Sequence, residues 1–163
     1  MKDMKADIVI LGIGQSLRGD DRAGLEAVRR WQMKYPLTAG SQRIRVECVE
    51  LPGLGLLELL KGAAAGINVD AVRSEGIPGS VYLLKDEELL SFGEGASSAH
   101  GWGIAETLAL GRRIAPEDLP GHLRLIGIEA GGMEAFSQLS PGIEAALQKV
   151  AELIEAEVRV VGN

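Results

Sequence analysis

The segment IVILGIGQSLRGDD, residues 8–21, decides the fold. Its first four residues, 8–11, are a short apolar run, which predicts a buried strand. Glycines follow directly and predict a tight turn at the end of that strand. The next helical pattern begins behind Asp20 and Asp21, not behind a phosphate-binding lysine. Because open α/β sheets carry their chemistry at the carboxyl ends of the strands, the segment places two carboxylates where an active site is expected.

The bulk composition favours one domain over residues 1–163 with an aliphatic core. Hydrophobic residues make up 46% of the chain and aromatic residues only 4%, as suits a parallel or mixed sheet covered by helices. The formal charge of −6 argues against a nucleic-acid partner, which would need a basic face. No apolar run approaches the roughly 20 residues of a membrane span, and no secretory signal is visible. We therefore expect a cytoplasmic protein without membrane insertion.

Strand-like runs alternate with helical patterns along the chain. The runs cover residues 8–11, 43–49, 64–72, 81–84 and 123–128. Helical spacing of apolar residues covers 23–35, 54–60 and 103–111, and a last helix runs from Pro141 to Val158 with Ser140 as its N-cap. Residues 85–99, rich in Gly, Ser and acids, are expected to be a surface loop with some helix. This alternation predicts a three-layer α/β/α sandwich.

Three polar side chains are expected at the strand ends. They are Asp21, Asp70 at the end of a second apolar run, and His100, one of only two histidines. Each also has a plainer interpretation: one aspartate of the pair 20–21 as a helix cap, Asp70 as a turn former, His100 as a cap or surface residue. Two carboxylates and one imidazole with open positions suit a borderline divalent ion such as zinc or nickel. The sequence therefore predicts a three-ligand metal site.

Other motifs carry less chemistry. The third glycine of a dinucleotide fingerprint is replaced by Leu17, and no Gly-Lys-Ser/Thr follows. His122 has no identifiable acid partner and is expected to be structural or exposed. Cys48, the single cysteine, alternates with Ile44 and Val46, which predicts a buried core thiol rather than a nucleophile.

Motifs spread over nearly the whole chain carry a family resemblance. They are ILGIGQSLRGDD at residues 10–21 with Gly24, the strand end VDA at 69–71, GIPG at 76–79, His100 before an apolar helix, GIE at 127–129 and LSP at 139–141. In this order they resemble the hydrogenase maturation endopeptidases, which trim the C-terminus of the large subunit of nickel–iron hydrogenases.

The resemblance implies an α/β/α sandwich with a twisted, mostly parallel mixed sheet of about five strands. It also implies that Asp21, Asp70 and His100 occupy the family's metal-contacting positions and form the catalytic site. The partner would be a hydrogenase large-subunit precursor that already holds nickel and is cut once to release a C-terminal peptide. Nickel would thus be supplied by the precursor, and zinc or cadmium could substitute for it in crystals.

Two other functions stay open. The first is a metal-independent hydrolase in which Asp21 and Asp70 act as a general acid/base pair, as in an aspartyl protease. The second is a non-catalytic escort that binds the hydrogenase subunit. Metal dependence of cleavage separates the first from a nickel-recognising protease, and a mass shift of the precursor on incubation would exclude the second.

Overall fold

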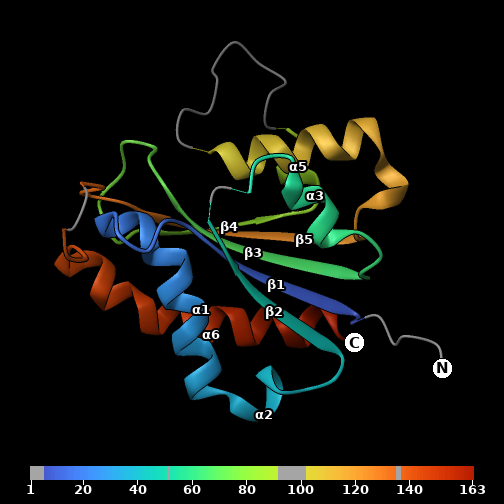
Figure 1. Ribbon diagram of the computed structural model, residues 1–163, viewed down its shortest axis with the longest axis horizontal. Coiled ribbons are helices and arrows are strands. Elements are labelled where there is room, and N and C mark those ends of the chain that lie inside the picture. Colours follow the sequence, from blue (N-terminus) through green and yellow to red (C-terminus); the bar gives the residue numbers. More distant parts are fainter. Residues whose placement is uncertain (1–5, 51, 92–101, 135–136) are drawn as a thin grey trace.

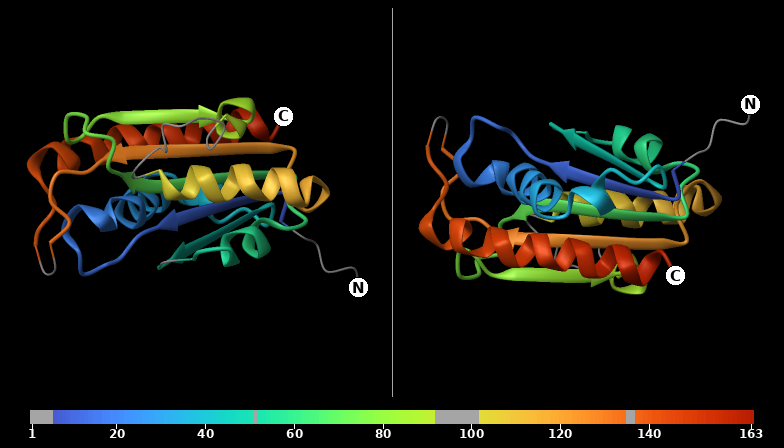
Figure 2. Two further views of the ribbon diagram at one scale, coloured as in Figure 1. Left: turned by 90° about the horizontal axis from the view of Figure 1, so that it is seen from above. Right: turned by 90° about the horizontal axis from the view of Figure 1, so that it is seen from below.

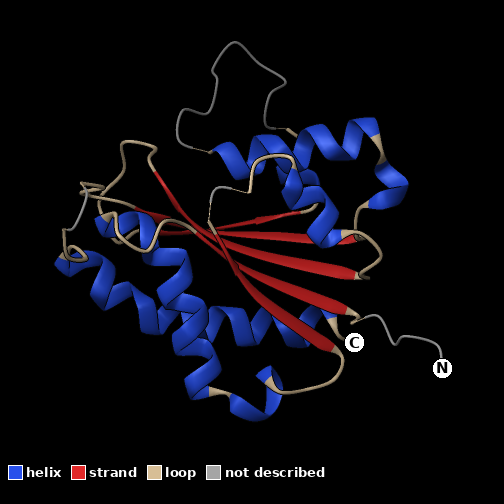
Figure 3. Cartoon of the chain, in the orientation of Figure 1, coloured by secondary structure: helices blue, strands red, loops and turns tan. Residues whose placement is uncertain are grey.

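The computed structural model describes residues 6–50, 52–91, 102–134 and 137–163, and its centre is one twisted mixed sheet (Figures 1 and 3). The strand order is β2-β1-β3-β5-β4. All neighbouring strands pair in parallel except β4, which pairs antiparallel with β5. The strands are β1 (Ile8–Ile13), β2 (Ile44–Val49), β3 (Ala65–Val72), β4 (Val81–Lys85) and β5 (His122–Glu129).

Helices cover both faces of this sheet, as the two views of Figure 2, each looking onto one face, show. One face carries α1 (Ala23–Lys34) and α6 (Pro141–Val161), with α2 (Pro36–Ala39) beside them. The other face carries α3 (Gly55–Leu60), α4 (Glu87–Leu90) and α5 (Gly103–Ile114). Two 3₁₀ turns, η1 (Gly19–Arg22) and η2 (Pro116–Asp118), complete the described elements. The predicted three-layer α/β/α sandwich is confirmed.

The alternation of side chains along the strands separates two apolar layers. In β3, Ile67 and Val69 pack in the layer under α1 and α6. Their neighbours Asn68 and Asp70 therefore lie on the face covered by α5. Most of that face is aliphatic, including Leu11 of β1. Register and alternation together bring Asp70 to the end of a buried strand on the α5 face.

The structure extends the predicted elements and corrects two details. All five predicted strand runs and the four predicted helices are present, with small shifts at their ends. Cys48 is exposed, so the prediction of a buried core thiol is wrong: β2 is an edge strand, and none of its residues is fully buried. Ser140 is the N-cap residue of α6, but its hydroxyl does not bond to that helix. His122 is exposed, as expected. Across the part of the chain that is described, no helix combines the length and apolarity needed to cross a membrane.

Candidate functional site

A cavity of about 270 Å³ lies at the carboxyl edge of the parallel strands, between the loops after β1 and β2 and the beginning of α5. Such edges are where open α/β sheets bind their ligands. Two carboxyl groups, those of Asp21 and Asp70, reach this cavity from different elements. The lining residues are Ile13, Gly14, Asp21, Pro52, Gly53, Asp70, Gly103, Ile104 and Thr107.

Asp21 is brought to the cavity by the glycine turn after β1. Gly14 has a φ of 150°, and a Cβ there would lie 1.9 Å from the backbone oxygen of Asp21, so only glycine fits. Gly19 has a φ of 50° and starts the 3₁₀ turn that carries Asp21. Burial raises the pKa of Asp21, and the charge of Arg18 and a backbone hydrogen bond from Gln15 offset only part of that effect.

Asp70 is the more strongly perturbed of the two acids. Burial, followed by the negative charge of Asp21, raises its pKa from 3.8 to about 8, against a backbone hydrogen bond from Ala71 that lowers it. The electrostatic effect of Asp21 places the two carboxyl groups in one local environment. Strongly perturbed acids in a cleft are typical of functional sites. Within the described residues, the positive charge near the cavity is too small to keep both acids ionised at neutral pH.

The third predicted site residue, His100, lies outside the described residues. The structure therefore brings together two of the three predicted side chains and leaves the third to prediction. Among residues 6–50, 52–91, 102–134 and 137–163, no group of three or more His, Cys, Asp or Glu side chains could hold a metal ion. Asp21 and Asp70 supply two oxygen ligands, and any further ligand would come from elsewhere.

Comparison with known proteins decides the family. The family model described as hydrogenase maturation protease matches residues 52–157, which include Asp70 and the start of α5. The chain belongs to the hydrogenase maturation protease family. It is similar to the hydrogenase 2 maturation protease of Escherichia coli strain K12, with 27% identity over 95% of this chain and 92% of that protein. It is also similar to the hydrogenase expression/formation protein HoxM of Azotobacter vinelandii, with 30% identity over 90% of this chain and 73% of that protein.

Solved structures agree with this assignment. The hydrogenase maturating endopeptidase HybD from E. coli superposes with a TM-score of 0.76 at 25% identity, over 95% of this chain and 93% of that one. The family resemblance seen in the sequence is thus confirmed, and with it the prediction that the chain is an endopeptidase of this family.

Asp20, for which the sequence offered only the interpretation of a helix cap, holds a loop of this maturation protease in place. Its carboxylate is fully buried. It accepts hydrogen bonds from the backbone N–H groups of Gly131 (2.7 Å), Gly132 (3.1 Å) and Ser140 (2.6 Å), and from the Ser140 hydroxyl (2.6 Å). Burial raises the pKa of Asp20, but these hydrogen bonds outweigh it and the pKa is lowered.

The plainer interpretation of the aspartate pair as a cap for the next helix is wrong. The N-cap of α1 is Arg22, and no side chain caps that end. Asp20 instead binds at the beginning of α6, a helix of 21 residues whose N-terminal dipole favours a negative charge. Because Asp20 fixes η1 to the loop before α6, it also fixes the adjacent Asp21.

Glu129 plays a similar part at the end of β5. Its side chain is only 1% exposed. It accepts hydrogen bonds from Ser74 N–H (2.9 Å), the Ser74 hydroxyl, Gly76 N–H (2.9 Å) and the Tyr82 hydroxyl (3.1 Å). Burial raises its pKa, but the hydrogen bonds lower it below the usual range. Glu129 thereby fixes the loop that follows Asp70; the only sequence signal for it was the GIE motif at 127–129.

Proposed function

We propose that this protease removes the C-terminal extension of a nickel-loaded hydrogenase large-subunit precursor, acting in the cytoplasm. The observation that carries the proposal is the pairing of Asp21 and Asp70 on one cavity at the carboxyl edge of the sheet. The pairing occurs in a chain whose relatives are named hydrogenase maturation proteases, among them one for hydrogenase 2. His100 would complete the ligand set.

The donor set fits a divalent cation brought by the substrate. Burial raises the pKa of both acids, and the negative charge of Asp21 raises that of Asp70 further, so a cation between the two carboxyl groups would offset an unfavourable interaction. Carboxylate oxygens and an imidazole suit nickel, while soft sulfur ligands would stay with the precursor, because the single cysteine, Cys48, is not among the cavity residues. When bound, nickel would polarise the scissile carbonyl and lower the pKa of an attacking water.

The site residues of the chain would then bind and position the metal of the precursor. Asp21 and Asp70 would bind the precursor's metal and fix its position over the strand ends. Metal recognition would act as a checkpoint, because a precursor without nickel lacks the group that these carboxylates bind. Two carboxylates and one imidazole are few ligands, so the free protease is expected to bind nickel weakly by itself.

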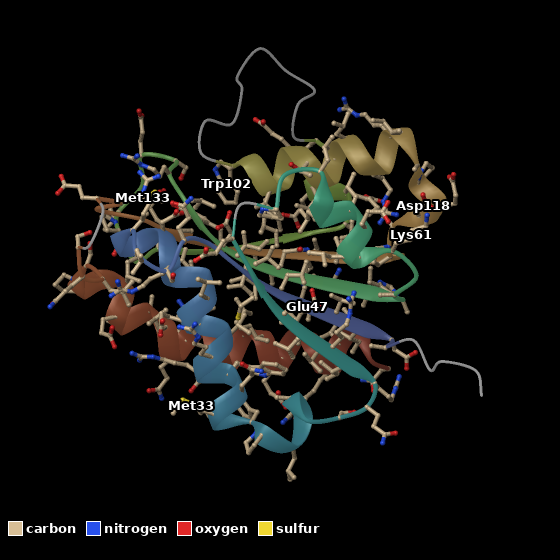
Figure 4. The ribbon with its side chains drawn as sticks, viewed as in Figure 1. Met33, Glu47, Lys61, Trp102, Asp118 and Met133 are labelled. Atoms are coloured by element: carbon tan, nitrogen blue, oxygen red, sulfur yellow. The ribbon has the colours of Figure 1, made fainter. Side chains whose placement is uncertain are left out.

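Cleavage of purified precursor, with and without nickel, tests the proposal by mass spectrometry. We expect the nickel-loaded precursor to lose one C-terminal peptide and the nickel-free form to stay intact. Asp21→Asn and Asp70→Asn should each abolish processing. Asp118→Asn is the matched control, because Asp118 lies exposed at the opposite edge, 3.6 Å from Lys61 (Figure 4). If the mass of the precursor stayed unchanged both with and without nickel, the chain would act as a non-catalytic escort instead.

One observation favours a second function, the metal-independent acid/base hydrolase. At neutral pH, a pKa of about 8 keeps Asp70 protonated beside Asp21, as required of a carboxyl pair that shares one proton. In that case both forms of the precursor would be cut at equal rates, and chelators would have no effect. The same experiment therefore separates the two functions.

A further inference from the structure

Trp102 immediately precedes α5, and its indole ring packs against the apolar layer on the α5 face of the sheet. Figure 4 shows it at the start of that helix. Gly127 of β5 pairs with Asp70 of β3 on one side and with Tyr82 of β4 on the other. All three residues lie on the α5 face, because their chain neighbours fill the opposite apolar layer. Asp70, Gly127 and Tyr82 therefore form a row across three neighbouring strands. The central residue of this row, Gly127, has no side chain.

The indole of Trp102, together with a methyl group of Val72, fills the space that Gly127 leaves. A Cβ added to Gly127 would lie 3.1 Å from Cη2 and Cζ3 of that ring and 3.1 Å from Cγ1 of Val72, closer than ordinary contacts. Side chains directly opposite one another on neighbouring strands are about 5 Å apart. The six-membered ring of Trp102 therefore lies between the positions of Asp70 and Tyr82.

The far side of the indole is held rigidly. The rings of Tyr82 and Trp102 meet edge to face, with centroids 5.4 Å apart and an interplanar angle of 62°. The Tyr82 hydroxyl donates to the buried Glu129 carboxylate at 3.1 Å. Glu129 is in turn held by backbone N–H groups of the β3–β4 loop. This chain of contacts fixes the indole from the side opposite to Asp70.

We propose that Trp102 is a positioning residue of the protease, whose ring occupies the β5 side of Asp70 and directs the carboxyl group toward Asp21 and the cavity. The proposal rests on the proposed function and deepens it. Without the indole, the part of the space over Gly127 that the ring fills would be open, and the Asp70 side chain could rotate toward β5 or toward entering water. A displacement of about 1 Å at a reacting group costs on the order of 10²-fold in rate.

Cleavage kinetics of the nickel-loaded precursor test this role. Trp102→Ala should lower kcat by about 10²-fold with KM changed much less, because substrate binding is retained while the site is misaligned. Trp102→Phe, which keeps a flat ring in the same place, should recover most of the rate. Gly127→Ala should lower kcat without deleting the indole, since its methyl group would displace the ring. Circular dichroism and thermal unfolding establish that each variant is folded.

A second measurement does not depend on activity. The chain has two tryptophans, and Trp31 is fully buried under the opposite face with its Nε1 bonded to Glu155 at 2.9 Å. In a Trp31→Phe background, Trp102 is the sole indole emitter. Asp70→Ala should then shift its emission to the red and increase quenching by acrylamide, because water replaces the carboxyl group beside the ring. Asp118→Ala is the control and should leave the emission unchanged.

The outcomes separate this inference from the proposed function. If the wild-type protein cleaves the precursor and Trp102→Ala cleaves it equally fast, the positioning role is wrong while the proposed function stands. The positioning role would also be wrong if Trp102→Phe failed to recover the rate lost in Trp102→Ala. It would be wrong as well if Trp102→Ala raised KM and left kcat unchanged. If the wild type leaves the precursor intact, the proposed function fails, and the emission of the Asp70→Ala variant still decides whether the indole lies beside that residue.

Discussion

Asp20 and Asp21 are adjacent in the chain, yet their carboxyl groups lie in opposite environments. Asp20 is fully buried and accepts four hydrogen bonds, and its pKa is lowered. Asp21 faces a cavity, and burial raises its pKa. A carboxylate whose lone pairs are satisfied by backbone donors is stable as an anion and serves the fold. A carboxylate with only one backbone donor, as Asp21 has in Gln15, keeps oxygen lone pairs available to a cation or a proton from outside.

The same contrast recurs on the two strands beside them. Glu129, at the end of β5, is held by four donors and orders the β3–β4 loop. Asp70, on β3, has its pKa raised to about 8 by burial and by Asp21. Thus one pair of acids, Asp20 and Glu129, fixes the loops around the cavity, and the other pair, Asp21 and Asp70, is the one to which we assign the proposed chemistry. Unfavourable electrostatics are concentrated where function is proposed.

The largest effect expected from breaking this contrast is on activity. Asp70→Asn keeps the shape of the side chain but removes a negatively charged ligand, so cleavage of nickel-loaded precursor should fall by at least about 10²-fold. The fold should persist, because the replaced acid has little hydrogen bonding to lose. Single-turnover assays followed by mass spectrometry measure the rate. A variant that keeps wild-type activity would remove Asp70 from the site.

The next largest effect concerns stability. Asp20→Ala leaves two glycine N–H groups and the N-terminus of α6 without their acceptor, and should cost about 3 kcal/mol in the free energy of unfolding. Urea denaturation measures this loss.

Leu147→Ala is the matched control for Asp20→Ala. Leu147 is fully buried in α6. Its truncation to alanine should lower the free energy of unfolding by about 2–5 kcal/mol, an amount comparable to the loss expected for Asp20→Ala. Only Asp20→Ala should also increase hydrogen exchange in the loop between β5 and α6. A loss below about 1 kcal/mol for Asp20→Ala would show that the donors find water instead.

The two pairs should also respond oppositely to pH. Because the folded-state pKa of Asp70 lies above its unfolded value of 3.8, the metal-free protein loses stability from this residue as pH rises from about 4 to about 8. Asp20 and Glu129 have lowered pKa values, so their contribution is present above the unfolded values and is lost as pH falls. Asp70→Asn should therefore stabilise the metal-free protein clearly at pH 8.5 and much less at pH 4.5. Equal changes at both pH values would contradict the raised pKa.

The smallest effect is expected for Glu129→Gln. The amide keeps the shape and one acceptor oxygen, but its NH₂ group faces donors from Ser74 and Gly76. We expect a loss of about 1–2 kcal/mol, measured by thermal unfolding. The cleavage rate should fall less than in Asp70→Asn. A fall in cleavage rate as large as that of Asp70→Asn, in a variant that stays folded, would place Glu129 in the site itself.

The sequence predicted most of the fold because the strands obey simple periodicity. Residues 64–72 and 123–128 are continuous apolar runs between turn signals, as buried parallel strands are. Cys48 was misplaced because alternation shows which face a residue occupies, but not whether its strand lies at the sheet edge. The short helices α2 and α4 fall below the length at which periodicity is informative.

The site was predictable only in part. Asp21 and Asp70 could be placed at one edge of the sheet because Asp21 follows the glycine turn after one strand-like run and Asp70 ends another, and parallel strands bring their carboxyl ends together. The role of Asp20 depends on Ser140, 120 residues away, and no local pattern reveals that contact. The packing of the Trp102 ring over Gly127 depends on the registers of three strands, one of them antiparallel. Long-range register is set by packing of the whole sheet rather than by any short segment.

Anomalous scattering from crystals soaked with nickel, zinc or cadmium tests most directly whether the unsatisfied acids form the metal-recognising pair. The account predicts one peak in the cavity, with nickel or zinc within about 2.0–2.2 Å of a carboxylate oxygen from each of Asp21 and Asp70. Asp70→Asn crystals under the same soak should lose it. A peak at Asp20 or Glu129 instead, or none in the cavity at saturating metal, would contradict the division between carboxylates that hold the fold and carboxylates that bind the substrate's metal.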